Sequence, residues 1–330
     1  MKGSKNVLSM CQSVEEQDAL FRASALAQQF HSRIAAAGYS DRLKEISREL
    51  GASTDVDEVM DALERAAASF DISFISECIL EEVRRYTESA LYSPVARTVV
   101  AGPFAGVVLF EDREIRLTLM SLSPIGHRMK KLSPSGTGDQ GVTIQGSDTV
   151  IRFLRSGGAV LRVWEVEAFE RDDALHGRTL PECVRQNVSN GGVIRLVGGR
   201  HGMSIERIED SSTFVMATNL RPRVAVNAHF REECGVLHSF TASRMASSRI
   251  QLLTTMLREL DQGGFDSMVD QLQSDDHFVR WHVMREMLAM DMNGSTPHLL
   301  KMASEDPHPQ VRDVANEVSG MINGERQCRV

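Results

Sequence analysis

The spacing of apolar residues changes twice along this chain of 330 residues. From about residue 13 to residue 92 they recur every three or four positions, which is the spacing of one face of a helix. From about residue 95 to residue 242 they alternate with polar residues, as Ile115 and Leu117 do, which is typical of a half-buried strand. Helical spacing returns at Ser243. The sequence therefore predicts an α+β chain in which strands lie between two helical regions.

We predict three parts: a helical segment over residues 1–94, an antiparallel β domain over 95–242 and a helical region over 243–330. Short turns separate roughly nine or ten predicted strands in the middle part, which favours a barrel or a two-sheet sandwich over a βαβ fold. Within it, "TVIRFLR", "SGG" and "AVLRVWEVE" fit a strand, a glycine turn and a second strand. In the first part we expect one helix to end at Gly51 and the next to be capped by Thr54.

The composition bounds the class of protein. Hydrophobic residues make up 42% of the chain and charged residues 25%, as in an ordinary soluble globular protein. A formal net charge of −8 argues against nucleic-acid binding, because phosphates attract basic proteins. No run approaches the roughly 18 apolar residues of a transmembrane helix. The cysteines are scattered without a CxxC pair, which indicates reduced thiols. We expect a cytoplasmic protein that binds neither nucleic acid nor membranes.

A pattern of two helices and a turn is written twice in the last part, over Phe265–Met290 and Thr296–Ile322. The second copy has Asp306–Pro307 in its turn and Val311–Arg312 in the first turn of its second helix. The first copy has Val279–Arg280 at the same place. This pattern resembles the HEAT repeat, whose members pair two antiparallel helices and often have an Asp–Pro turn and a Val–Arg pair at these points.

The resemblance implies a surface for a protein partner or for a second copy of the chain. Arg280 and Arg312 could reach the acidic turn of their own or the adjacent copy, and Trp281 could anchor a partner. Two copies are fewer than the roughly three that a free-standing solenoid needs, so we expect the pair to dock on the rest of the protein. The alternative is that these helices only cover the β domain.

A many-stranded antiparallel domain raises the question of a metal. The strand count resembles the cupin jelly roll, whose members often bind a divalent metal through histidines and a carboxylate. The usual His-x-His signature does not occur, but His229, Glu232 or Glu233, and His238 could form a two-histidine, one-carboxylate site for Fe or Zn. The alternative is that Glu232 lies at a solvated hairpin tip. His176 and His201 could complete such a site, or could be exposed in a loop and a turn.

An arginine-rich set occurs in the later strands and turns. Arg195, Arg221 and Arg223 could hold a small anionic ligand through bidentate contacts. The alternative is a solvated face on which these arginines pair with nearby acidic residues.

These features give two hypotheses for function. In the first, the chain is a binding or scaffold protein whose β domain holds a ligand and whose HEAT-like helices bind a partner. In the second, it is a cupin-like, metal-dependent enzyme of the oxygenase type that acts on a small molecule or a peptide.

Overall fold

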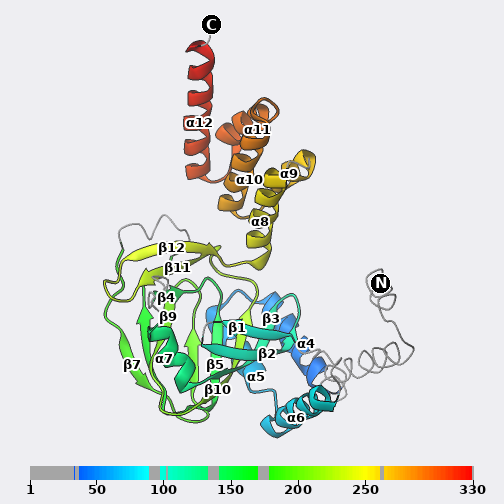
Figure 1. Ribbon diagram of the computed structural model, residues 1–330, viewed down its shortest axis with the longest axis vertical. Coiled ribbons are helices and arrows are strands. Elements are labelled where there is room, and N and C mark those ends of the chain that lie inside the picture. The colour runs from blue at the N-terminus through cyan, green and yellow to red at the C-terminus, as the bar shows by residue number, and fades with distance from the viewer. Residues whose placement is uncertain are drawn as a thin grey trace, which may run out of the picture. The chain divides into compact units, whose positions relative to one another are not determined.

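The computed structural model describes residues 33, 37–88, 97–101, 103–132, 141–169, 178–260 and 264–328. The chain divides into two compact units between Phe240 and Thr241. The first unit contains helices and the described strands, the last of which continues to Ala242, and the rest of the second unit is helical (Figure 1). The predicted α+β class, with helices before and after an antiparallel β domain, is confirmed.

The first unit begins with three amphipathic helices, α4 (Tyr39–Ala52), α5 (Val56–Ala67) and α6 (Ile72–Glu88). Their apolar faces bury residues such as Leu43 and Leu63, which are fully inaccessible to solvent. The side chain of Asp55 caps α5 by accepting hydrogen bonds from two backbone N–H groups of its first turn. The predicted cap, Thr54, was therefore wrong by one residue, because the carboxylate of Asp55 is the acceptor placed to reach these groups.

Twelve strands in the described residues form two six-stranded antiparallel sheets. Sheet A has the order β1 (Thr98–Ala101), β2 (Phe104–Glu111), β3 (Ile115–Leu122), β10 (Ser212–Asn219), β5 (Thr149–Arg155) and β8 (Val193–Leu196). Sheet B has the order β12 (Leu237–Ala242), β11 (Val226–Arg231), β4 (Gly141–Ile144), β9 (His201–Arg207), β6 (Val160–Glu165) and β7 (Val184–Asn187). The two sheets are separate, so of the two predicted architectures the sandwich is the one observed.

The predicted strand–turn–strand around Gly157 and Gly158 is not a hairpin. Its strands β5 and β6 belong to different sheets, so this turn takes the chain from sheet A to sheet B. Gly157 has a φ of +60°, and a Cβ atom there would lie 2.3 Å from the carbonyl oxygen of Asp210. Glycine is required at this crossing because no side chain fits against the next backbone segment.

Sheet A is covered on both faces, which makes the first unit a stack of three layers (Figure 1). Alternate residues such as Leu117 and Val150 pack against α4–α6. Their neighbours, such as Met120 and Ile151, pack toward sheet B. This alternation follows from the two-residue period of a strand, and it creates an apolar interior between the sheets.

A short helix that the sequence did not suggest, α7 (Pro124–Leu132), follows β3. The hydroxyl of Ser123 accepts a hydrogen bond of 3.0 Å from the backbone N–H of Gly126, and Pro124 occupies the first turn, where it loses no needed hydrogen bond. Both features start a helix within a region whose overall period is that of strands.

The second unit consists of α8 (Met245–Leu260), α9 (Phe265–Gln271), α10 (His277–Met290), α11 (Met292–Glu305) and α12 (Pro309–Cys328). Helices α9 and α10 and helices α11 and α12 form consecutive pairs, and α8 packs on α10 (Figure 1). The predicted helical region is therefore present, while its identification as HEAT repeats stays a prediction. None of the helices in the described ranges is both long and apolar enough to span a membrane.

Candidate ligand site between the sheets

A cavity of about 370 Å³ lies between the two sheets. Sheet A supplies an apolar wall made of Phe104, Met120, Ile151, Leu196, Phe214 and Met216. Sheet B supplies Thr143 from β4 and His201, Met203 and Ile205 from β9. Cavities of this size that are mainly apolar and contain a few polar groups are typical binding sites for small molecules.

Strand alternation explains why these residues meet in the cavity. His201, Met203 and Ile205 are spaced two apart on β9, so their side chains lie on one face of sheet B. Met203 and Ile205 pack in the cluster between the sheets, which identifies this face as the inner one. His201 is therefore a polar residue placed at the edge of an apolar interior.

His201 is held in one tautomer. Its Nδ1 accepts a hydrogen bond of 3.0 Å from the backbone N–H of Val197, so in the neutral ring the proton is on Nε2. Burial lowers the pKa of His201 below its usual value, and the nearby charge of Arg200 adds to this, against the opposing charge of Glu165. Within the described part of the chain Nε2 has no hydrogen-bond partner. The ring thus offers a neutral N–H donor.

The turn before β9 fixes the position of His201. The backbone N–H of Gly198 donates a 3.0 Å hydrogen bond to Oδ1 of the fully buried Asp148, which also accepts one of 2.7 Å from Arg223. A Cβ atom on Gly198 would lie 2.3 Å from the carbonyl oxygen of Gly146. The glycine is needed because two backbone segments meet here.

Glu232 provides the second polar group of the cavity. Its side chain is only 7% exposed, and Oε1 binds Nη2 of Arg162 at 2.6 Å and the hydroxyl of Ser204 at 3.4 Å. The Arg162 guanidinium in turn lies over the ring of Trp164, 5.9 Å from its centroid. The second oxygen, Oε2, has no partner among the residues that the structure describes. One face of this carboxylate is therefore available to a ligand.

Helix α7 borders the same cavity through His127. Its Nε2 lies 3.4 Å from the backbone carbonyl oxygen of Glu206 on β9. This contact joins the helix to sheet B, so α7 forms part of the wall.

The residues predicted to hold a metal each have another partner in the structure. His229 lies beside Thr143, with Nδ1 3.0 Å from its hydroxyl, and burial followed by the nearby His238 lowers the pKa of His229. His238 has Nδ1 3.5 Å from Arg231, and Glu232 is bound to Arg162. No group of three or more His, Cys, Asp or Glu side chains that could hold a metal occurs in the described ranges. The arrangement does not offer a metal a ligand set, and the Fe or Zn site stays a prediction.

Two further sequence proposals concern loop histidines and arginines. His176 lies outside the described residues. The three arginines Arg195, Arg221 and Arg223 each bind a carboxylate of their own unit rather than converging on one point. Their partners are Asp61 and Glu64 for Arg195, Glu114 for Arg221 and Asp148 for Arg223. These pairs join α5 and the turns to sheet A, and an anion-binding role for the arginines stays untested.

The residues proposed for partner binding lie in the second unit. Arg280 is buried and donates hydrogen bonds of 2.8 and 2.7 Å to the two carboxylate oxygens of Asp306. Arg312 donates one of 2.6 Å to the Asp306 carbonyl oxygen, and Trp281 of α10 packs against the apolar cluster that α10 shares with α11 and α12. The expectation that Arg280 reaches the acidic turn of the adjacent copy is confirmed, while a role in partner binding stays a prediction.

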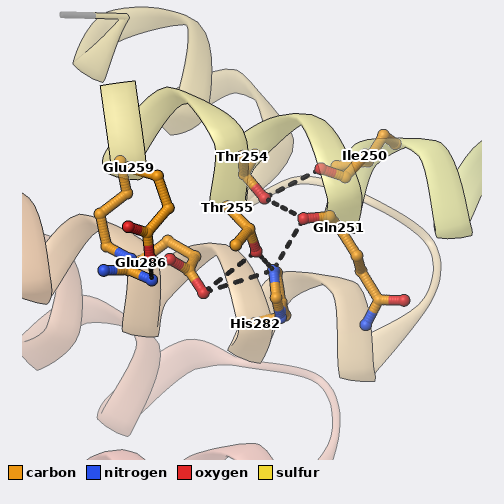
Figure 2. A network of polar contacts seen from close by, with 8 residues as sticks. Ile250, Gln251, Thr254, Thr255, Glu259, His282 and Glu286 are labelled. Atoms are coloured by element: carbon orange, nitrogen blue, oxygen red, sulfur yellow. Dashed lines mark hydrogen bonds and ion pairs between the residues drawn. The ribbon is translucent and has the colours of Figure 1, made fainter. Parts of the chain in front are cut away.

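A polar network joins α8 to α10 (Figure 2). Nε2 of His282 lies 3.0 Å from the carbonyl oxygen of Gln251 and 3.2 Å from the hydroxyl of Thr255. That hydroxyl also donates a 3.3 Å hydrogen bond to Glu286, which binds Arg258 as well. The network fixes which face of α8 points into the second unit.

Sequence reasoning missed the cavity and its two polar groups. The sequence suggested that His201 completes a metal site or is exposed in a turn, and that Glu232 binds a metal or lies at a hairpin tip. The signal for His201 was its two-residue spacing from Met203 and Ile205, which places it on their face. No local signal identifies Glu232, because its partner Arg162 is distant in sequence.

No protein-family model and no curated protein matches this chain. Among solved structures it is similar to a cupin domain from Bordetella pertussis Tohama I, with 12% identity over 37% of this chain and 97% of that one and a TM-score of 0.22. An RmlC-like cupin from Shewanella frigidimarina matches with 6% identity over 38% and 83% of the two chains and a TM-score of 0.24. A sugar phosphate isomerase of the cupin superfamily from Silicibacter pomeroyi matches with 10% identity over 42% and 76% and a TM-score of 0.24. TM-scores of this size do not establish a shared fold, so the sandwich assignment rests on the strand pairings.

Proposed function

We propose that the β domain binds a small, largely apolar organic molecule in the cavity between its sheets. The observation that carries the proposal is the coexistence of an apolar cavity of about 370 Å³ with two polar groups that keep hydrogen-bonding capacity. Buried polar groups are normally satisfied within the protein. Groups left open at the wall of a cavity are therefore suited to a ligand.

The two open groups define the chemistry of that ligand. The Nε2 hydrogen of His201 suits an acceptor, such as a carbonyl or ether oxygen. Oε2 of Glu232 suits a donor, such as a hydroxyl or amino group. Because the carboxylate is negative and His201 is neutral, an anionic ligand gains no partner here. We infer a neutral or cationic amphiphile with an acceptor near His201 and a donor near Glu232.

The metal-dependent oxygenase, the other function predicted from the sequence, is not supported by a metal-ligand group among the described residues. The cupin-like relationship that suggested it likewise stays a proposal. The polar groups described above are arranged for recognition, and we derive no reaction from them.

The test is ligand binding by the purified full-length chain and two matched variants. Native mass spectrometry identifies co-purified molecules, and calorimetry against neutral and cationic amphiphiles measures affinity. Ile205→Trp places an indole in the cavity, while Val184→Trp adds the same ring at a side chain that is 70% exposed. We expect the first variant to abolish binding and the second to leave it unchanged.

His201→Asn gives a finer test of the proposed contact. The asparagine Oδ1 can replace Nδ1 as acceptor for the Val197 N–H, but the donor at Nε2 is lost. We expect affinity to fall about 10-fold, the value of one hydrogen bond, with little change in thermal stability. The proposal is contradicted if no compound of the library binds the wild-type chain. It is also contradicted if Ile205→Trp leaves binding intact.

A further inference from the structure

Helix α8 has an apolar face that nothing described in the structure covers. Its five large apolar side chains are between 47% and 61% exposed. One exposed leucine is ordinary on a protein surface, so the question is whether these side chains lie together. Together with one arginine they form what we call the outer face of α8: Met245, Arg249, Leu252, Leu253, Met256 and Leu260. At 3.6 residues per turn these positions fall within a sector of about 100°. The apolar residues are thus gathered into one stripe.

The opposite face of α8 is already used within the second unit. Ile250 and Leu257 pack against α9 and α10, and the hydroxyl of Ser247 donates to the buried Asp276. The His282 network shown in Figure 2 adds polar contacts from the same side. Within the described part of the second unit the outer face therefore has no apolar partner, and rotation of the helix cannot bury it.

The order of residues on the outer face is symmetric about its centre. Leu252 and Leu253 lie on either side of the midpoint, Arg249 and Met256 lie at equal distances from it, and so do Met245 and Leu260. Suppose that a second copy of α8 runs antiparallel and is related to the first by a two-fold axis through this midpoint. At the centre of this pair, Leu252 of each copy then lies opposite Leu253 of the other. Met245 lies opposite Leu260 at each end, so apolar residues lie opposite one another at the centre and at both ends of the pair.

The single charge on the face fits the same arrangement. Arg249 has no ion pair or hydrogen bond within the part of the chain that the structure describes. In the antiparallel pair it lies opposite Met256 of the partner subunit, one helical turn from Glu259 of the partner subunit. Glu259 is 63% exposed and binds Arg258 of its own helix. Two symmetric Arg249–Glu259 contacts would flank the apolar centre.

We propose that α8 is a homodimerisation helix, which pairs with α8 of a second copy in antiparallel orientation through its outer face. The proposal is independent of ligand binding by the β domain. Because α8 has 16 residues and a length of about 24 Å, the contact is smaller than a standard interface of about 1,600 Å². We therefore expect a reversible dimer with a micromolar dissociation constant.

Sedimentation equilibrium of the full chain tests the stoichiometry, over concentrations from about 1 μM to 1 mM. Leu252→Glu places a charge at the centre of the interface, and we expect it to weaken the dimer at least about 100-fold. Leu300→Glu is the matched control, because Leu300 is an exposed leucine of α11 in the same unit. It should leave the dimer intact. A wild-type chain that stays monomeric, or a dimer that Leu252→Glu does not weaken, overturns the proposal. If the β domain or another protein covers this face instead, the full chain alone should sediment as a monomer.

Cysteine cross-linking tests the orientation. In the antiparallel pair two copies of residue 252 lie about 1.5 Å apart along the helix axis, whereas two copies of residue 260 are offset by about 22 Å. Leu252→Cys should form a covalent dimer under mild oxidation. Leu260→Cys should form no more covalent dimer than the wild-type chain, which has only its native cysteines. Equal cross-linking of both variants contradicts the antiparallel register even if the chain dimerises.

Discussion

In the second unit, the buried Arg280 guanidinium meets both oxygens of the Asp306 carboxylate. In the first unit, the equally inaccessible Glu232 binds Arg162 through one oxygen and leaves the other without a partner in the described residues. Nη1 of Arg280 also donates to the carbonyl oxygens of Ser274 and Asp275. One buried charge is thus completely enclosed by its own chain, whereas the other faces an apolar cavity.

The difference separates polar groups that hold the fold from polar groups that await a ligand. A fully satisfied buried pair is costly to break, since either partner alone would be an uncompensated charge. A group with remaining capacity contributes less to stability and more to recognition, because function often uses residues that stability would not select. Each substitution below should therefore affect mainly one property.

The largest effect should come from Arg280→Met. It removes both hydrogen bonds to Asp306 and leaves the carboxylate buried without its cation. We expect the helical unit to lose about 3 to 5 kcal/mol of stability. Chemical denaturation followed by circular dichroism measures this loss, and ligand binding by the β domain should not change.

Arg312→Met is the matched control, because this arginine donates to the Asp306 carbonyl oxygen and not to its carboxylate. Its cost should be about 1 kcal/mol, the value of one ordinary hydrogen bond. If the two arginine variants lost equal stability, the enclosed pair would have no special importance and the comparison would fail.

The contrast between the two units also shows what the sequence could foretell. The Arg280–Asp306 contact was predictable, since the repeated pattern places a Val–Arg pair and an acidic turn at fixed positions. The alternating period likewise predicted strands such as β3, and Gly51 was correctly placed near the end of α4. Local patterns report local structure well, because the helix and strand periods are written into neighbouring residues.

The candidate site was not predictable in the same way. Arg162 and Glu232 lie on segments that are distant in sequence, and only the order of strands in sheet B brings them together. The Gly157–Gly158 turn suggested a hairpin, but it joins two sheets, and no local pattern distinguishes these outcomes. The cavity itself depends on the gap between two sheets, which is a property of the assembled fold.

An intermediate effect should come from Glu232→Gln. The glutamine can keep an oxygen acceptor for Arg162 and Ser204, so we expect a loss of stability of at most about 1 kcal/mol. Cationic ligands should lose much more affinity than neutral ones, because the carboxylate charge is gone. Calorimetry with a matched neutral and cationic pair measures this. A stability loss as large as that of Arg280→Met would show that Glu232 is structural and not a recognition group.

The smallest effect concerns pH, and it should differ between the two units. Burial lowers the pKa of His201 below the usual 6.5, so the unfolded chain binds the proton more tightly, and the β domain should lose stability as pH falls below about 6.5. For Asp306 burial works to raise the pKa, but the hydrogen bonds and charge of Arg280 outweigh it and hold it below 3.8. The helical unit should keep this contribution until pH falls below about 4. Thermal unfolding measured from pH 7.5 to pH 3.5 tests both expectations. His201→Asn should weaken the pH dependence of the stability of the β domain and leave that of the helical unit unchanged. If it leaves the profile of the β domain unchanged, another group such as His229 titrates there instead, because its pKa is also lowered by burial.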